Sequence, residues 1–237
     1  MFQTDPFALI VVLVGLSLIP FVAMIATSYL KIVVVMSLIR NALGIQSIPP
    51  NMVVNALAMI LTFYIMAPVV SESWGILAES QRARAAAVAS APKADGQGAT
   101  VQHPATLDLS SLELGKAAEP FRKFLSDHTA PRERAFFVKT AETLWSKDGE
   151  PALVDHESFW ILLPSFCVSE LTKAFQIGFL VYLPFIAIDI IVSNILLAMG
   201  MMMVSPVTIS LPFKLLLFVM VNGWTLLIQG LVKGYLL

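Results

Sequence analysis

The hydrophobic positions of this chain fall in two long regions, 1–70 and 158–237, which are separated by a polar region, 71–157. Charge follows the same division, because the three regions carry three, five and 23 charged residues respectively. Segments 7–26 and 52–70 contain no charge. At about 1.5 Å per residue, each is long enough to cross roughly 30 Å of hydrocarbon. The pattern predicts apolar helical hairpins at both ends and a polar insert between them.

Prolines interrupt both apolar regions. Pro20 and Pro68 predict kinks in the first region. Pro164 and Pro184 predict that the last region is divided into shorter helices, with a hairpin turn at Pro184. Such interruptions are tolerated where protein or a water-filled path satisfies the freed backbone groups. The sequence therefore predicts an all-α, membrane-associated protein of broken apolar helical hairpins, with protein around them.

The polar insert is expected to be partly helical and partly disordered. Its middle, 82–105, is rich in Ala, Ser, Gly, Gln and Pro, which predicts a flexible linker. Ser110 or Ser111 can cap a helix that runs to about Asp127, and Pro131 suits the first turn of another that ends before Gly149. One face of this second helix is apolar and must pack on the first helix or on a neighbouring subunit. That face consists of Phe137, Ala141, Leu144 and Trp145.

Composition supports a membrane protein. Hydrophobic residues make up 57% of the 237 residues and charged residues 13%, with a mean hydropathy of +0.81, which is unusual for a soluble domain. The net charge of −1 gives no basis for binding nucleic acid. Lys31 and Arg40 are the only charges in segment 27–51, which predicts a cytoplasmic loop there and a periplasmic insert. Asp5 stands where a signal peptide would be basic, so the first apolar segment is expected to remain in place.

Catalytic and metal-binding patterns are lacking in the sequence. His103, His128 and His156 are scattered through the insert without the spacing of metal ligands. Cys167 is the only cysteine and lies in an apolar run, where an inert thiol is expected. We therefore expect neither an enzyme nor a protein that holds a metal or cofactor.

Four of the five charged residues in the last apolar region are candidate partners of one another. Glu170 and Lys173 are three residues apart, as in a local helical ion pair. A hairpin at Pro184 and a second turn near 204–206 would bring Lys214 to the depth of either Glu170 or Asp189. An unpaired charge in an apolar setting costs several kcal/mol. We expect Glu170 to meet Lys214 across a subunit boundary, with Lys173 and Asp189 as supporting charges.

The second turn carries three consecutive methionines, Met201, Met202 and Met203. Methionine is flexible and specifies a unique packing poorly, so these residues could simply fill space in an apolar core. The same flexibility suits a surface that closes around changing shapes. Taken with the lysine inside the following apolar helix, the turn indicates a deformable seal in a membrane-associated assembly.

These segments resemble the FliP/SctR (YscR-type) family of type III secretion export-apparatus subunits. The matching stretches are TSYLKIVVVMSLIRNALGIQSIPPN at 27–51, LTFYIMAP at 61–68, LPSFCVSELTKAFQIGFLVYLPFIAIDIIVSNILLAMGMMM at 163–203 and SPVTISLPFKLLLFVMVNGW at 205–224. Residues 82–105 have no counterpart that we can place. The sequence around the methionines and the lack of a visible signal peptide favour the injectisome branch of the family over the flagellar branch.

The resemblance implies an export gate. In this family, copies of the subunit assemble with two smaller hydrophobic partner subunits into a ring-like complex in the bacterial inner membrane. Unfolded proteins pass through its centre, and the methionine loop lines the pore as a gasket, here Met201, Met202 and Met203. Asn222 stands where the family often has aspartate.

A second class of function remains open at this stage. A small-solute or ion transporter could use Glu170, Asp189 and Lys214 as coupling charges. Inverted repeats would favour a transporter, and none is visible between residues 1–70 and 158–237.

Overall fold

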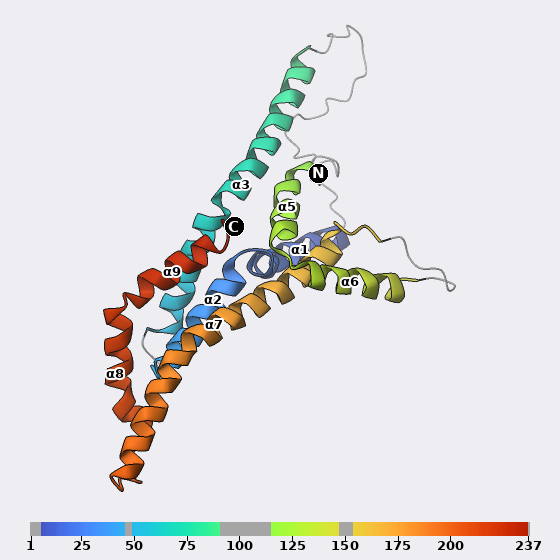
Figure 1. The fold of residues 1–237 in the computed structure, drawn as a ribbon. Helices are drawn as coiled ribbons and strands as arrows, with labels where there is room; N and C mark the ends of the chain where they lie inside the picture. Colours follow the sequence, from blue (N-terminus) through green and yellow to red (C-terminus); the bar gives the residue numbers. More distant parts are fainter. Residues whose placement is uncertain (1–5, 46–48, 91–114, 147–153, 237) are drawn as a thin grey trace, which may run out of the picture. The chain divides into compact units, whose positions relative to one another are not determined.

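The computed structural model describes residues 6–45, 49–90, 115–146 and 154–236, and these form helices and turns without any strand. The all-α fold class is thereby confirmed. The helices, labelled as in Figure 1, are α1 (Pro6–Ile25), α2 (Tyr29–Ala42), α3 (Asn51–Ser90), α5 (Glu119–His128), α6 (Pro131–Leu144), α7 (Phe159–Ala198), α8 (Pro206–Met220) and α9 (Gly223–Lys233).

Contacts divide the chain into two compact units. Unit 1 combines Met1–Met66 with His128–Leu237, and unit 2 is Ala67–Asp127. Unit 2 holds the later turns of α3 and nearly all of α5. Unit 1 holds the remaining helices and is where the candidate sites lie.

Helix α2 is the centre of the core of unit 1. Its fully buried side chains recur at helical spacing and pack with residues of α7, α8, α9 and the first turns of α3. Contact with α7 is close, because a Cβ at Gly178 would collide with the side chain of Leu38. The prediction of a loop over 27–51 was therefore wrong for Tyr29–Ala42. An uninterrupted run of helix-compatible residues with one apolar face forms a buried helix instead.

Helix α7 is a single helix of 40 residues, although it contains Pro164 and Pro184. The predicted hairpin at Pro184 was wrong, and Figure 1 shows α7 as a bent but unbroken helix. A proline removes one N–H donor and favours a kink, yet packing of its neighbours can hold the helix together. Phe185, next to Pro184, is buried in the core, and its ring centroid lies 6.4 Å from that of Phe218 on α8 in a tilted arrangement.

The predicted linker and insert helices are partly observed. Residues 82–90 continue α3 to Ser90, since their alanines and arginines are good helix formers. The rest of the linker, 91–105, lies outside the described residues. Helix α6 begins at Pro131 as predicted and ends at Leu144. Its Ala141, together with Val138, packs on Ile161 of α7, and Phe137 is partly buried against them. Leu144 and Trp145 of the predicted face are exposed. A contact of this face with a neighbouring subunit stays a prediction.

Several helices could cross a membrane. Among the described residues, Asn51–Ala83 of α3 and all of α7 are long and apolar enough. Up to four spans result if two bent pairs each count as one. These pairs are Leu13–Ile25 with Tyr29–Ala42, bent by 60°, and Pro206–Met220 with Gly223–Lys233, bent by 59°.

Candidate functional site

The methionine loop, Met201–Met203, lies in the turn between α7 and α8. Helix α7 ends in a Schellman motif, in which Gly200 adopts φ +74°, a conformation that glycine reaches without strain. The backbone N–H of Met201 donates to the carbonyl of Leu196 at 2.9 Å, and that of Gly200 donates to Leu197 at 3.0 Å. Pro206 then starts α8 at its first turn. Glycine and proline thus place the three methionines at the tip of a helical hairpin.

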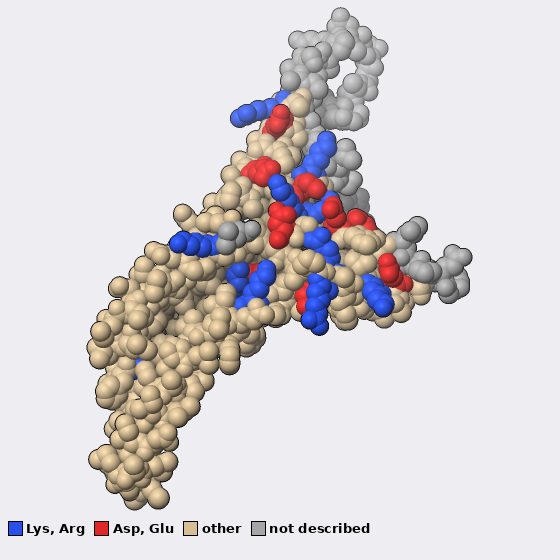
Figure 2. Space-filling view, viewed as in Figure 1, with Lys and Arg blue, Asp and Glu red and all other residues tan. Residues whose placement is uncertain are grey.

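The side chains of the methionine loop are exposed in the single chain. Relative exposure is 82% for Met202 and 101% for Met203, while Met201 is partly covered. Figure 2 shows no charged side chain on the visible face at this end of the α7–α8 hairpin. Three flexible apolar side chains therefore project from an uncharged tip, which favours a contact with another apolar surface over a packed core.

Lys214 of α8 forms the centre of a first buried charge cluster. Its Nζ lies 2.6 Å from Oδ2 of Asp189 on α7, and the lysine is 3% exposed. Ser210, one turn before Lys214, donates a hydrogen bond of 2.5 Å to the other oxygen of Asp189. The ion pair and this hydrogen bond hold the two arms of the α7–α8 hairpin together.

Lys214 also satisfies the end of α2. Its Nζ donates to the backbone carbonyl of Ala42 at 3.3 Å. Ala42 is the last residue of α2, where carbonyl groups have no partner within the helix and the helix dipole favours a cation. One lysine therefore connects three helices.

Glu170 of α7 forms the centre of the second cluster and is completely buried. Its Oε2 lies 3.0 Å from Nζ of Lys31 on α2, and its Oε1 lies 3.0 Å from Nζ of Lys173. Lys173 also donates to the carbonyl of His128 at 2.6 Å. Two cations and a hydroxyl, that of Tyr235, thus surround one carboxylate, as a buried charge requires.

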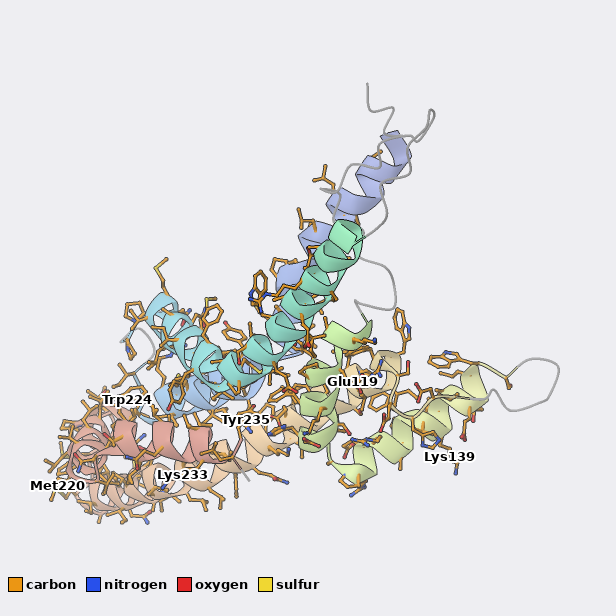
Figure 3. The ribbon with its side chains drawn as sticks, turned by 90° about the horizontal axis from the view of Figure 1, so that it is seen from above. Glu119, Lys139, Met220, Trp224, Lys233 and Tyr235 are labelled. Atoms are coloured by element: carbon orange, nitrogen blue, oxygen red, sulfur yellow. The ribbon has the colours of Figure 1, made fainter. Side chains whose placement is uncertain are left out.

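Tyr235, two residues after α9, completes this cluster. Its hydroxyl donates to Oε2 of Glu170, and its ring lies beneath Lys31, whose Nζ is 3.4 Å from the ring centroid. Burial raises the pKa of Tyr235, and the nearby Glu170 carboxylate raises it further. The phenol therefore stays protonated and acts as a donor. Figure 3 labels Tyr235 where the chain leaves α9.

The structure brings together some of the predicted charges. The local pair of Glu170 with Lys173 is present, and so is the alternative pairing of Lys214 with Asp189. Glu170 and Lys214 are not paired within the chain, since each has other partners. A contact between them across two copies stays a prediction.

Sequence reasoning missed Lys31 and Tyr235. Lys31 was counted as a loop charge, but it lies four residues before Val35 and eight before Ile39, on the buried face of α2. That spacing was the available signal. For Tyr235 the sequence offers no comparable signal, because its partners are more than 60 residues away.

Asn222 has a backbone role at the bend between α8 and α9, whose two sides are marked by Met220 and Trp224 in Figure 3. It adopts φ 51° and ψ 46°, the left-handed region. Asparagine and aspartate enter this region more readily than other side chains. The adjacent Gly223 is needed because a Cβ there would collide with the ring of Phe218. Either residue type at position 222 therefore suits the turn without any role for charge.

Within the parts of the chain that the structure describes, no group of three or more His, Cys, Asp or Glu side chains could hold a metal ion. His103 lies outside the described residues. The chain has helices of membrane-spanning length, ion pairs buried among them and an uncharged hairpin tip. These features define a helical membrane protein.

Comparison with known proteins gives the family. The FliP family matches residues 12–231. The Yop proteins translocation protein R of Yersinia pestis is 48% identical over 233 residues, which cover 98% of this chain and 97% of the relative. The Hypersensitivity response secretion protein HrcR of Ralstonia nicotianae is 46% identical over 228 residues, or 96% of each chain. The Virulence protein YscR of Salmonella typhimurium is 42% identical over 231 residues, covering 98% and 97%.

The chain therefore belongs to the FliP family. The resemblance read from the sequence is confirmed, and the names of these relatives confirm the injectisome branch of the family.

Proposed function

We propose that this chain is a core, non-enzymatic subunit of the export gate of a type III protein secretion system. In this proposal several copies assemble with two smaller hydrophobic export-apparatus subunits, and unfolded proteins leave the cell through the pore that they form. The relatives support the secretion role, since their names refer to translocation, secretion and virulence. The pore and the two partner subunits are supported by the family resemblance.

The observation that carries the proposal is the exposed methionine loop. Met202 and Met203 have almost no contacts within their own chain, and the hairpin tip around them carries no visible charge. In a ring of copies, such tips would meet near the central axis and close the pore when it is empty. An apolar constriction resists water and ions by dewetting, and flexible thioethers can adapt to a passing chain.

Bacterial inner-membrane location, several membrane passes and a periplasmic insert are part of the same proposal. Membrane-length helices support the membrane passes. The charge of Lys31 no longer supports the orientation, because that lysine is buried in an ion pair and not exposed in a loop. The family resemblance therefore carries the orientation.

The charges considered for a transporter have structural partners. Glu170, Asp189 and Lys214 each form an ion pair within the chain, and two of these three side chains are almost fully buried. The observed pairs account for them without an ion-coupling role, which favours the export gate over a transporter.

The test replaces Met201, Met202 and Met203 with alanine together. Truncated side chains should widen the constriction, so we expect higher ion conductance of cells expressing the complete complex, while protein export persists at least in part. The control is a matched triple-alanine change of exposed apolar residues on α8 away from the tip, namely Phe213, Leu216 and Val219. Unchanged conductance in a correctly assembled loop variant would contradict a gasket role.

A further inference from the structure

The segment that follows α9 enters the Glu170 cluster and is held there by several separate contacts. The Tyr235 hydroxyl donates to Glu170 on α7 and lies 3.5 Å from the backbone carbonyl of Ser28. The Tyr235 ring covers Nζ of Lys31 and lies 5.1 Å, centroid to centroid, from the ring of His128. Its backbone carbonyl is 3.4 Å from Nε2 of His128. Tyr235 therefore touches side chains and backbone at once.

These contacts join segments that are far apart in the sequence. Ser28 lies at the bend between α1 and α2, Glu170 lies in the first half of α7, and His128 ends α5. Helix α9 adds Leu227 and Leu231 to the core of unit 1, and these are the only buried side chains among its 11 residues. Two leucines give a short helix limited apolar burial. The polar contacts of Tyr235 are thus a large part of what fixes α9.

The hydroxyl of Tyr235 is also needed by Glu170. A buried carboxylate is stable only when charges and donors surround it, and loss of one partner leaves the others with uncompensated charge. Glu170 is fully buried and receives its third donor from Tyr235. The same contact therefore fixes α9 and completes the Lys31–Glu170 ion pair between α2 and α7.

We propose that Tyr235 is a latch that holds α9 against α2 and α7. When the latch is closed, the tyrosine hydroxyl caps the Lys31–Glu170 pair and its ring shields Lys31. When it is open, α9 leaves the core while the α2–α7 contact persists through its apolar side chains. This role concerns the closure of one subunit and does not depend on the proposed export function.

The latch can be tested with a thiol reporter in the purified full-length protein. Cys167 is replaced by serine, which removes the only native cysteine, and Leu231→Cys supplies the reporter. Leu231 is 2% exposed, so a cysteine there reacts with a maleimide only while α9 is undocked. A second reporter, Leu162→Cys in α7, is fully buried away from α9 and reports loss of the rest of the core.

Each reporter is combined with Tyr235→Phe, Tyr235→Ala or the control Leu236→Ala, which changes an exposed neighbour. Tyr235→Phe removes a hydrogen bond to a charged group, so α9 should be undocked for a larger fraction of the time. We therefore expect a roughly tenfold to hundredfold faster reaction at Leu231→Cys in this variant. The loss of the ring should increase the rate further in Tyr235→Ala, and Leu236→Ala should leave it unchanged.

Two results would overturn the latch. One is an unchanged reaction rate at Leu231→Cys in the Tyr235→Phe variant. The other is an equal acceleration at both reporters, since that would show a general loss of stability and no selective release of α9.

Discussion

Single buried side chains in this protein connect elements that are distant along the sequence. Lys214 contacts Asp189 on the neighbouring helix and the carbonyl that ends α2. Glu170 contacts Lys31 from the first apolar region, as well as Lys173. In a setting of low dielectric constant, each charge is tolerable only because an opposite charge and further hydrogen bonds surround it. These buried charges therefore help to determine which helices pack against one another.

At this scale we predict unequal effects of the two partners in the Asp189–Lys214 pair. Asp189→Ala would leave an almost fully buried lysine with one carbonyl, whereas Lys214→Ala would leave a carboxylate that is 32% exposed and still bound by Ser210. Breaking a fully buried pair costs about 3–5 kcal/mol. We expect Asp189→Ala to lower the melting temperature in detergent more than Lys214→Ala, as measured by tryptophan fluorescence.

Charge swaps identify the partner of Lys214. Asp189→Lys combined with Lys214→Asp should recover part of the complex yield that the single changes lose, because the two side chains face each other in one chain. Recovery by Glu170→Lys with Lys214→Glu would instead support the predicted contact between copies.

Two helices in this chain end at a glycine in a Schellman turn, and α7 continues through two prolines. Gly200 ends α7 and Gly44 ends α2, both with positive φ and the Schellman hydrogen bonds. Pro184 lies inside α7 and does not end it. The consequence for function is that the hairpin with the methionine loop has one long arm, α7, and a shorter one, α8.

The polar insert and α2 should be accessible from opposite sides of the membrane. The division at 70 and 157 remains a prediction from charge, and a periplasmic insert follows from the family resemblance. In a Cys167→Ser background, Lys139→Cys on the exposed face of α6 should react with a membrane-impermeant maleimide in cells whose outer membrane is permeabilised. Asn41→Cys, exposed near the end of α2, is the matched control and should react only after lysis. The reverse labelling pattern would contradict the proposed orientation.

The single chain leaves a large apolar surface uncovered. Exposed large hydrophobic side chains occur along α1, α3, α7 and α8, for example Leu13, Phe63, Phe179 and Phe213. Isolated exposed apolar residues are ordinary, but this many on membrane-length helices require lipid or other subunits as cover. The chain is therefore suited to an assembly in which copies and partner subunits cover one another.

For the whole molecule we predict self-association. In mild detergent, native mass spectrometry of the purified chain should show oligomers, and co-expression with the two smaller subunits should give one larger complex of defined mass. A triple alanine variant at the exposed α7 residues Phe175, Phe179 and Leu183 tests whether the α7 face contributes, and should shift the distribution towards monomers. A strictly monomeric chain, with and without partner subunits, would contradict the proposed assembly.

The sequence by itself determined the class of protein and the place of its special turn. Two apolar regions, a polar insert, a proline at the start of α6 and the resemblance around the methionines were enough for an all-α membrane protein of this family, because periodicity and composition are local properties. Only the tertiary structure decided that Lys31 is buried, that Lys214 pairs with Asp189 and that Tyr235 reaches Glu170. It also decided that α7 continues through Pro184. These outcomes depend on which helices lie side by side, and the free energy of a buried charge or of a kinked helix is set by neighbours that are distant in sequence.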